Sequence, residues 1–470
     1  MKMKSKVNIV SLGCAKNLVD SEKIIADIAE KGGVICSDKK DADVIVINTC
    51  GFINSAKEES IDTILETVNL KEEGKCKRIV VTGCLAQRYK KELKKDIPEI
   101  DALLGINEFN NVANAVLDNL ANEPQIVKKV HNSKKCTSRE RNKNVVAQNH
   151  RISLTPKHYA YLKISDGCNN FCTYCSIPHI RGKHKSSSID NLLSEAELLA
   201  ASGVKELNII AQDTTVYGTD LYKKPKLHTL LNKLSEIDSI KWIRVLYAHP
   251  AHFYDELIDE ICQNKKICNY LDMPIQHIND HILKRMGRKT SRSQIETLIE
   301  KLRKRIDDLV LRTSIIVGFP GETEKRFSEL ADFIESTRFE RLGVFMYSRE
   351  EDTPAFSYNS QISKRLKDER FDTLMSIQQG VMFENNEQMV GRKVKVLIDS
   401  PFQRPNKDSE ATHSDYNENQ KNMWLARSYA DAPEVDANII ITSEKAIKTG
   451  TFKDVTITST EDYNLIGTVK

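Results

Sequence analysis

The stretch YAYLKISDGCNNFCTYC, residues 159–175, joins a strand-like run to three cysteines in the pattern CxxxCxxC. These cysteines are Cys168, Cys172 and Cys175. Three chemistries use such closely spaced thiols: a disulfide, a zinc site and an iron–sulfur cluster. A disulfide would leave an odd cysteine and needs an oxidising compartment. Structural zinc usually takes a fourth Cys or His, which His179 or His184 could supply. Three thiolates can converge on one face of a 4Fe–4S cluster and leave one iron open to substrate.

The composition is that of a globular protein with sizeable cores. The chain has 470 residues, 40% of them hydrophobic and 29% charged, and this length suits about three domains. No apolar run approaches the roughly 20 residues that cross a bilayer, and Lys16 soon interrupts the short apolar start, unlike a signal peptide. We therefore expect a cytoplasmic protein with no membrane contact. In a reducing cytoplasm the 11 cysteines favour metal binding or catalysis over disulfides.

Around the cysteine motif, strand-like runs alternate with helical segments as far as about residue 347. Six runs at this spacing predict a partial (β/α)6 barrel with right-handed crossovers. The runs are residues 159–165, 205–212, 241–247, 268–274, 309–319 and 341–347. In one intervening helix, Ser188 or Asp190 could cap the start and Gly203 the end. The motif follows the first strand, so it lies on the C-terminal rim, where barrel active sites are built.

The N-terminal region, residues 6 to about 120, also alternates between strands and helices, which predicts a doubly wound parallel sheet. Three cysteines there each follow a strand: Cys14 after KVNIVSLG, Cys50 after DVIVINT and Cys84 after RIVVTG. A single cysteine in this place is usually a small buried hydrophobe. Three at the ligand-binding edge of one sheet predict a second cluster with three thiolate ligands. The neighbouring glycines Gly13, Gly51 and Gly83 would let the backbone come close to it.

The C-terminal region reads as short strands and predicts a small antiparallel β-barrel. A polar insert near residues 403–422 interrupts it. A polar, basic stretch separates the first two regions; it is either a linker or a basic patch for acidic or RNA surfaces. We expect four segments: an N-terminal domain over 1–125, the linker over 126–155, the (β/α)6 domain over 156–385 and the small barrel over 388–470.

The cysteine motif in this context, with Tyr174 just before its last Cys, resembles the radical S-adenosylmethionine (SAM) superfamily. The resemblance implies that the open iron chelates SAM and that an electron from the cluster releases a 5′-deoxyadenosyl radical. It also implies SAM contacts. The segment IIAQDT, with Gln212 and Asp213, matches where the family contacts methionine and ribose groups. The loop TSIIVGFPGE, with Gly318 and Gly321, resembles the segment near the adenine. No side chain beyond the cluster ligands is singled out as catalytic.

The chain has two such cysteine sets and a small C-terminal barrel. This arrangement resembles the methylthiotransferase family over nearly the whole chain, and the barrel matches the position of that family's TRAM domain. The family inserts a methylthio group at an unactivated C–H bond, with SAM as methyl donor and as radical source. The strings SLGCAKNLVDSE, NTCGFINSAKEESI and ARSYADAPEVDA resemble its ribosomal-protein branch, which modifies the β-carbon of an aspartate in the small-subunit protein uS12. The alternative is a tRNA adenosine. The resemblance further implies a low-potential electron donor such as flavodoxin or ferredoxin, and a monomer.

Charge gives modest independent support for a protein target. Residues 391–470 contain 11 Lys and Arg against 12 Asp and Glu, whereas a barrel that grips tRNA should be basic. The whole chain carries only +4, which is no general argument for nucleic-acid binding. We therefore expect acidic residues of the barrel, such as Asp431 and Glu434, to meet a basic protein by charge complementarity.

Other polar and sulfur-bearing residues have plainer interpretations. Five cysteines share no ligand-like setting and are interpreted as structural: Cys36, Cys76, Cys136, Cys262 and Cys268. His249 and His277 follow barrel strands and are interpreted as structural more readily than as substrate contacts. Arg349, Glu350 and Glu351 either face the target or form a solvated loop. Two rival functions fit less well. An iron–sulfur electron carrier normally closes all four ligand positions, and a plain RNA-binding module leaves six well-placed cysteines unexplained.

Overall fold

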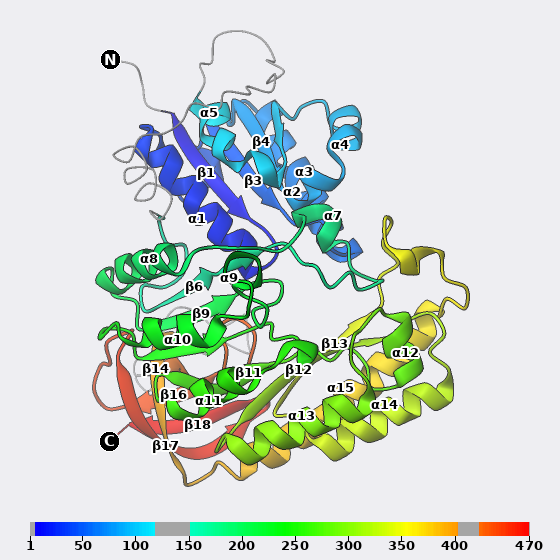
Figure 1. The fold of residues 1–470 in the computed structure, drawn as a ribbon. Coiled ribbons are helices and arrows are strands. Elements are labelled where there is room, and N and C mark those ends of the chain that lie inside the picture. The colour runs from blue at the N-terminus through cyan, green and yellow to red at the C-terminus, as the bar shows by residue number, and fades with distance from the viewer. Residues whose placement is uncertain (1–4, 118–150, 403–422, 470) are drawn as a thin grey trace, which may run out of the picture.

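The computed structural model describes residues 5–117, 151–402 and 423–469 in three stacked parts (Figure 1). An N-terminal α/β domain lies over one end of a central α/β sheet, and a closed β-barrel packs against one face of that sheet. The basic stretch and the polar insert fall on residues 118–150 and 403–422 and so lie largely outside the described residues, as does Cys136. No helix in the described ranges is long and apolar enough to span a membrane.

The N-terminal domain is a five-stranded parallel sheet in the order β2-β1-β3-β4-β5. Its buried strands are apolar on both faces: Val44 and Val46 pack with α1 and α5, whereas Ile45 and Ile47 pack on the side of α2, α3 and α4. This is the doubly wound layout that strand–helix alternation predicts. The elements are β1 (Lys6–Ser11), α1 (Ala15–Glu30), β2 (Val34–Ile35), β3 (Val44–Thr49), α2 (Asn54–Glu72), β4 (Arg78–Gly83), α3 (Cys84–Arg88), α4 (Lys90–Asp96), β5 (Ala102–Leu104) and α5 (Val112–Leu117).

The central domain is a six-stranded parallel sheet in the order β13-β12-β11-β10-β9-β6, and all six predicted strands are present. The strands are β6 (Tyr159–Lys163), β9 (Glu206–Ile210), β10 (Trp242–Val245), β11 (Ile267–Asp272), β12 (Val310–Val317) and β13 (Arg341–Met346). A short ladder, β7 (Ser165–Asp166) with β8 (Lys185–Ser186), brackets the cysteine motif. The helices are α7 (Ile177–Arg181), α8 (Ile189–Ala201), α9 (Thr219–Tyr222), α10 (Leu227–Ser235), α11 (Asp255–Gln263), α12 (Asp280–Arg285), α13 (Arg292–Arg305), α14 (Glu324–Thr337) and α15 (Lys364–Glu387).

Successive side chains along the central strands point to opposite faces of the sheet, and the two faces pack against different parts of the protein. Ala160 and Leu162 of β6 join the core shared with the helices. Tyr159 and Tyr161 point the other way and pack with residues of the C-terminal barrel. Helix α8 begins as predicted, because the Ser188 side chain accepts a hydrogen bond from the Asn191 N–H.

The C-terminal part is a closed barrel in the order β14-β15-β16-β18-β17. Its strands are β14 (Lys393–Pro401), β15 (Met423–Ser428), β16 (Ile439–Ser443), β17 (Phe452–Glu461) and β18 (Asn464–Val469). The predicted barrel is therefore present, and four of its strand pairs are antiparallel. The pair β16–β18 is parallel, because the hairpin β17–β18 brings the last strand back beside β16 in the same direction.

Candidate functional site

The three N-terminal cysteines lie together at the C-terminal edge of the first sheet. Cys14 caps α1, Cys50 follows β3 and Cys84 begins α3. Cys50 and Cys84 are buried, whereas Cys14 is exposed. Burial raises the pKa of the Cys84 thiol to about 12, and the neighbouring thiols Cys50 and Cys14 add to the rise. The three thiols are therefore electrostatic neighbours at one edge of the sheet, where a bound metal would displace their protons.

Two glycines allow the three loops that carry these cysteines to come close together. Gly13 has φ of +86°, and a Cβ placed on it would lie 2.7 Å from the Cys50 Cβ and 2.9 Å from the Cys50 Sγ. A Cβ on Gly51 would lie 2.8 Å from the Leu85 Cα. Only hydrogen atoms fit at these two positions, so the three cysteine loops pack as a unit.

The cysteine motif lies at the rim of the central sheet and is tied down by backbone hydrogen bonds. The Cys168 N–H donates to the Gly182 carbonyl at 3.1 Å, and the Thr173 N–H donates to the Met286 carbonyl at 2.9 Å. The Cys168 Sγ accepts from the Asn170 N–H at 3.4 Å. Burial raises the pKa of Cys168 to about 11. It also raises that of Cys175, to which Cys172 and Cys168 contribute electrostatically. These three thiols are therefore also electrostatic neighbours.

Two buried arginines approach the two sets of sulfurs, and sequence patterns did not single them out. An Arg181 Nη2–H donates to the Cys84 Sγ at 3.9 Å, and an Arg288 Nη1–H donates to the Cys172 Sγ at 3.9 Å. The only sequence signal for Arg181 is its place six residues after Cys175. Arg288 is far from any cysteine in the sequence and gives no such signal.

The residues predicted to contact SAM lie on three neighbouring segments of the rim. Gln212 follows β9 and donates to Asp166 at 3.0 Å; its Oε1 is buried without a partner among the described residues. Asp213 accepts from Asn170 at 2.8 Å and pairs with His252 at 2.8 Å. Tyr174 is partly buried and packs edge-on to Phe319, at 6.4 Å between ring centroids. Phe319 stands between the predicted Gly318 and the Pro320–Gly321 turn.

The structure shows local contacts for the two predicted glycines and the two histidines that follow strands of the central sheet. Gly318 and Gly321 have φ of +71° and +88°, and the Gly318 N–H donates to Glu322. His277 is fully buried and its Nδ1 accepts from two backbone N–H groups. His249 accepts from the Ala251 N–H at 3.1 Å and stacks on His252. His249, His252 and Asp213 have ligand atoms within 4.8 Å of one another.

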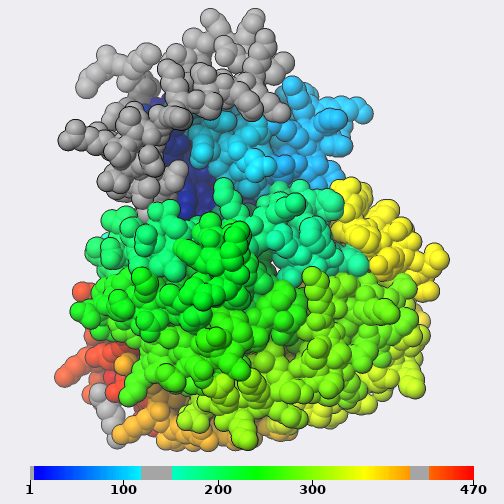
Figure 2. All heavy atoms as spheres, in the orientation of Figure 1, coloured from blue at the N-terminus to red at the C-terminus, as the bar shows by residue number. Residues whose placement is uncertain are grey.

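The expectation for Glu350 was wrong, because this side chain is buried against the N-terminal domain, whereas its neighbours Arg349 and Glu351 are exposed. Glu350 is 2% exposed and pairs with Arg88 at 2.8 Å and Lys57 at 3.0 Å, both in the N-terminal domain. Tyr89 donates to Glu351 at 2.9 Å. Figure 2 shows this segment, in yellow, at the border of the N-terminal domain.

The expectation for Asp431 was also wrong, whereas that for Glu434 stays a prediction. Asp431 is 3% exposed and pairs with Arg341 of β13 at 2.6 Å. Glu434 accepts hydrogen bonds from Tyr159 and Tyr161 of β6. Both carboxylates join the small barrel to the central sheet. Asp431 is buried and is not available to a basic partner, whereas Glu434 is exposed.

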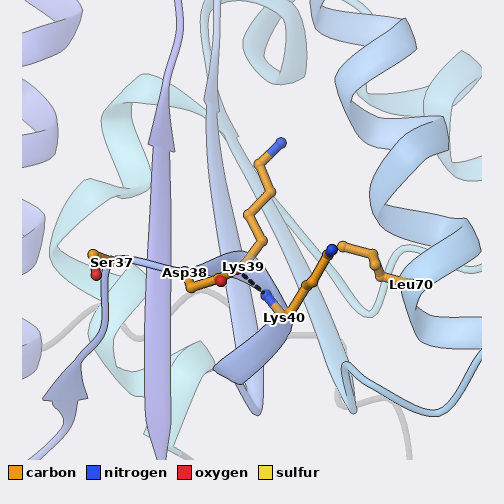
Figure 3. Close-up of a pocket in the computed structure, with 5 residues that line it drawn as sticks. All are labelled: Ser37, Asp38, Lys39, Lys40 and Leu70. Carbon is orange, nitrogen blue, oxygen red and sulfur yellow. Dashed lines mark hydrogen bonds between the residues drawn. The ribbon is translucent and has the colours of Figure 1, made fainter. Parts of the chain in front are cut away.

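The other described cysteines and a surface depression lie away from both sulfur sets. Cys76 and Cys268 are buried, whereas Cys36 and Cys262 are at least partly accessible, and none of them contacts a predicted ligand. A shallow depression of about 450 Å³, seen in Figure 3, is lined by Ser37, Asp38, Lys39, Lys40 and Leu70. It is open, and it contains none of the predicted site residues.

The comparisons with known proteins agree with this geometry. Residues 162–334 match the radical SAM superfamily, residues 390–469 match the TRAM domain, and residues 6–105 match an uncharacterized protein family, UPF0004. Two solved structures of a radical SAM methyltransferase, TsrM from Kitasatospora setae, share the fold. One covers 75% of this chain and 77% of its own at 14% identity with a TM-score of 0.50. The other covers 80% and 89% at 12% identity with a TM-score of 0.51.

The class is therefore that of a radical SAM enzyme that carries an additional N-terminal cysteine domain. A ribosomal protein uS12 methylthiotransferase RimO of Clostridium novyi is 48% identical over 99% of this chain and 98% of its own. The RimO protein of Lachnoclostridium phytofermentans is 46% identical over 99% and 100%. The chain belongs to the RimO family. It is a radical SAM methylthiotransferase that uses SAM and 4Fe–4S clusters, as the sequence predicted.

Proposed function

We propose that this enzyme attaches a methylthio group to the β-carbon of one aspartate of ribosomal protein uS12, free or in the small ribosomal subunit. The observation that carries the proposal is the pair of three-cysteine sites, one in each α/β domain, joined by the segment from Cys168 to Arg181. The relatives named above, which are 46–48% identical over their full length, support the same target.

Both sites fit a 4Fe–4S cluster with three protein ligands. At the N-terminal site, Gly13 leaves the space beside the Cys50 sulfur that a Cβ would fill. At the rim, the thiols of Cys168, Cys172 and Cys175 have the soft donor chemistry that iron–sulfur clusters need. The unpartnered Gln212 Oε1 suits a bound SAM. We assign Cys14, Cys50 and Cys84 to one cluster and the other three cysteines to the second. We assign SAM contacts to Tyr174, Gln212, Asp213, Gly318 and Gly321.

Bound clusters and SAM supply electron transfer, a carbon radical and a sulfur-holding iron. The chain's own side chains position the reactants. Asn170 and His252 hold the Asp213 carboxylate at 2.8 Å each, on the same rim as Cys168. Although burial opposes ionisation, Lys163 and Arg181 keep the pKa of Asp166 well below its usual value. Asp166 therefore stays charged and orients the Gln212 amide.

Metal analysis tests the ligand sets. Anaerobically purified enzyme should carry roughly eight irons per chain. Changing Cys14, Cys50 and Cys84 together to Ala should leave about half, and so should changing Cys168, Cys172 and Cys175. The buried Cys76→Ala variant is the control and should keep all of the iron. Stoichiometric zinc would contradict the assignment.

Mass spectrometry tests the substrate. The reconstituted enzyme, supplied with a low-potential donor such as flavodoxin or ferredoxin, should add one methylthio group to uS12 and leave tRNA unchanged. The rim triple variant should make no 5′-deoxyadenosine from SAM. The N-terminal triple variant should still make some but attach no sulfur. Methylthioadenosine in digested tRNA beside unmodified uS12 would contradict the proposal. We further propose a monomer, with domain limits at 1–125, 156–385 and 388–470.

A further inference from the structure

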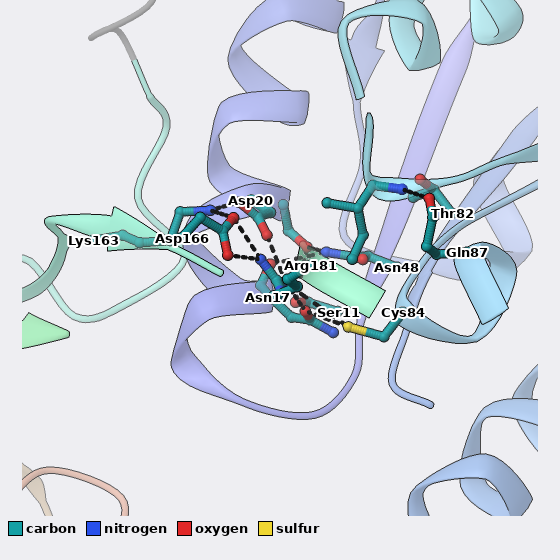
Figure 4. A network of polar contacts seen from close by, with 12 residues as sticks. Ser11, Asn17, Asp20, Asn48, Thr82, Cys84, Gln87, Lys163, Asp166 and Arg181 are labelled. Carbon is teal, nitrogen blue, oxygen red and sulfur yellow. Dashed lines mark hydrogen bonds and ion pairs between the residues drawn. The ribbon is translucent and has the colours of Figure 1, made fainter. Parts of the chain in front are cut away.

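Arg181 lies where the two α/β domains meet. It is the last residue of α7, and its side chain is 1% exposed. Its guanidinium donates to Asn17 Oδ1 at 2.6 Å and to Asp20 at 3.0 Å, both on α1. It also donates to Asp166 of its own domain at 2.9 Å and 3.1 Å. Figure 4 shows these contacts converging on one guanidinium.

The same guanidinium points at a sulfur of the N-terminal site. Its Nη2 is 3.9 Å from the Cys84 Sγ, and Cys84 is 4% exposed. Asn17, which Arg181 holds, donates to the Leu12 and Thr49 carbonyls at 3.0 Å and 3.1 Å. These two residues belong to the loops that carry Cys14 and Cys50. Arg181 therefore touches one cysteine directly and steadies the other two loops through Asn17.

The charged side chains around Arg181 neutralise one another without any charge on a cysteine sulfur. Asp20 and Asp166 face Arg181 and Lys163, and Lys163 pairs with both carboxylates. The two cations therefore neutralise the two carboxylates. The Arg181 Nη2 has two N–H groups and faces three acceptors, Asn17, Asp20 and Cys84. An N–H shared with the Cys84 sulfur is a donor to whatever negative charge that sulfur carries, and such bonds raise cluster potentials. Arginine suits this role because its planar fork can serve several acceptors at fixed angles.

Resting on the ligand sets assigned above, we propose that Arg181 is a positioning residue that couples the two cysteine sites. It locks the Cys84 side of the N-terminal site against the segment that carries Cys168, Cys172 and Cys175. It also stabilises the reduced form of the N-terminal cluster through the hydrogen bond to Cys84. Because residues 168–181 hold both the rim ligands and this guanidinium, the separation of the two sites is set by one short stretch of chain.

The test is an EPR-monitored redox titration of the full-length, fully loaded enzyme. Arg181→Met should shift the midpoint potential of the N-terminal cluster to a more negative value and leave that of the rim cluster unchanged. Arg288→Met is the matched variant, because Arg288 contacts Cys172 at the same 3.9 Å; it should shift the rim cluster instead. Arg365→Met, at an 82% exposed side chain, should shift neither.

Spin–spin broadening between the two reduced clusters is the second readout, because it reports their separation. Arg181→Met should change it, and Arg181→Lys, which keeps the charge but loses the fork, should restore the potential more than the broadening. In the cluster-free chain, amide exchange at α7 and at the start of α1 should rise at least several-fold in Arg181→Met. Normal potentials and broadening in a fully loaded Met variant would overturn the proposal. Wild-type enzyme with a single cluster would instead overturn the ligand assignment on which it rests.

Discussion

Gly13 shows at the scale of one residue why the N-terminal site tolerates so little change. Its φ of +86° lies in the left-handed region, and its missing Cβ leaves room for the Cys50 sulfur. Gly74 has a similar φ of +73°, but nothing lies within 4 Å of the position its Cβ would take. A comparison of substitutions at the two glycines therefore distinguishes the effect of backbone strain from that of steric contact.

We expect Gly13→Ala to lose about half of the bound iron, whereas Gly74→Ala should keep all of it. Both changes carry the left-handed penalty of about 1–2 kcal/mol, and Gly13→Ala should lower the free energy of unfolding further because its Cβ also meets Cys50. Only Gly13→Ala also displaces Cys50. Iron analysis and urea unfolding of the two variants check this, and equal iron contents would contradict the steric argument.

At the scale of elements, a buried charge network joins the small barrel to the central sheet. Glu206 of β9 is fully buried and pairs with Arg244 at 2.9 Å and with Arg427 of β15 at 2.8 Å. Arg427 also pairs with Asp399, whose carboxylate accepts from the His158 ring at 2.7 Å. Removing one member leaves uncompensated charge in a place that water cannot reach.

Glu206→Gln should therefore destabilise the chain by about 3–5 kcal/mol, the usual loss when one partner of a buried pair is removed. Glu369→Gln removes an exposed i,i+4 pair with Arg365 and should change stability by less than about 0.5 kcal/mol. Thermal or urea unfolding measures both. Similar values for the two variants would mean that the network contributes no more than a surface pair.

The secondary-structure elements also show which features can be predicted from the sequence and which cannot. Apolar alternation within strands and cysteines at strand ends are local signals, so the sheets, the rim position of the cysteine motif and the placement of Cys14, Cys50 and Cys84 at one sheet edge could be predicted. The burial of Glu350 and Asp431 could not, because a charged loop looks solvated until another domain covers it. Arg181 was missed for the same reason: its acceptors lie 161 and 164 residues away.

At the scale of the whole molecule, Glu350 joins the N-terminal domain to the central domain. It lies near the end of the central domain's sequence, whereas Arg181 makes its contacts to the N-terminal domain near the beginning. Burial opposes its ionisation, but hydrogen bonds from Ser348, Arg88 and Lys57 outweigh this and keep its pKa below the ordinary 4.5. A carboxyl with a depressed pKa stabilises the fold above its unfolded pKa, and the contribution is lost as the pH falls through the folded value.

The cluster-free chain should therefore hold its N-terminal domain firmly near neutral pH and loosen it progressively below about pH 4.5. Cluster-free protein is used because thiolate ligation is itself pH-dependent. Amide exchange in α2 and α3 measures the loosening. Glu350→Gln should remove this pH dependence, whereas Glu296→Gln, at an exposed pair with Arg292, should retain it.

The position of Arg181 in the chain also gives the N-terminal site an order of assembly. All three of its cysteines are synthesised by residue 84, but the guanidinium that reaches Cys84 is made 97 residues later. At roughly 5–20 residues per second, the three thiols emerge several seconds or more before that partner. A chain fragment that ends at residue 117 should thus present Cys84 to alkylating reagents, while the finished chain shields it. The site belongs to the first domain in sequence, but its completion waits on the second.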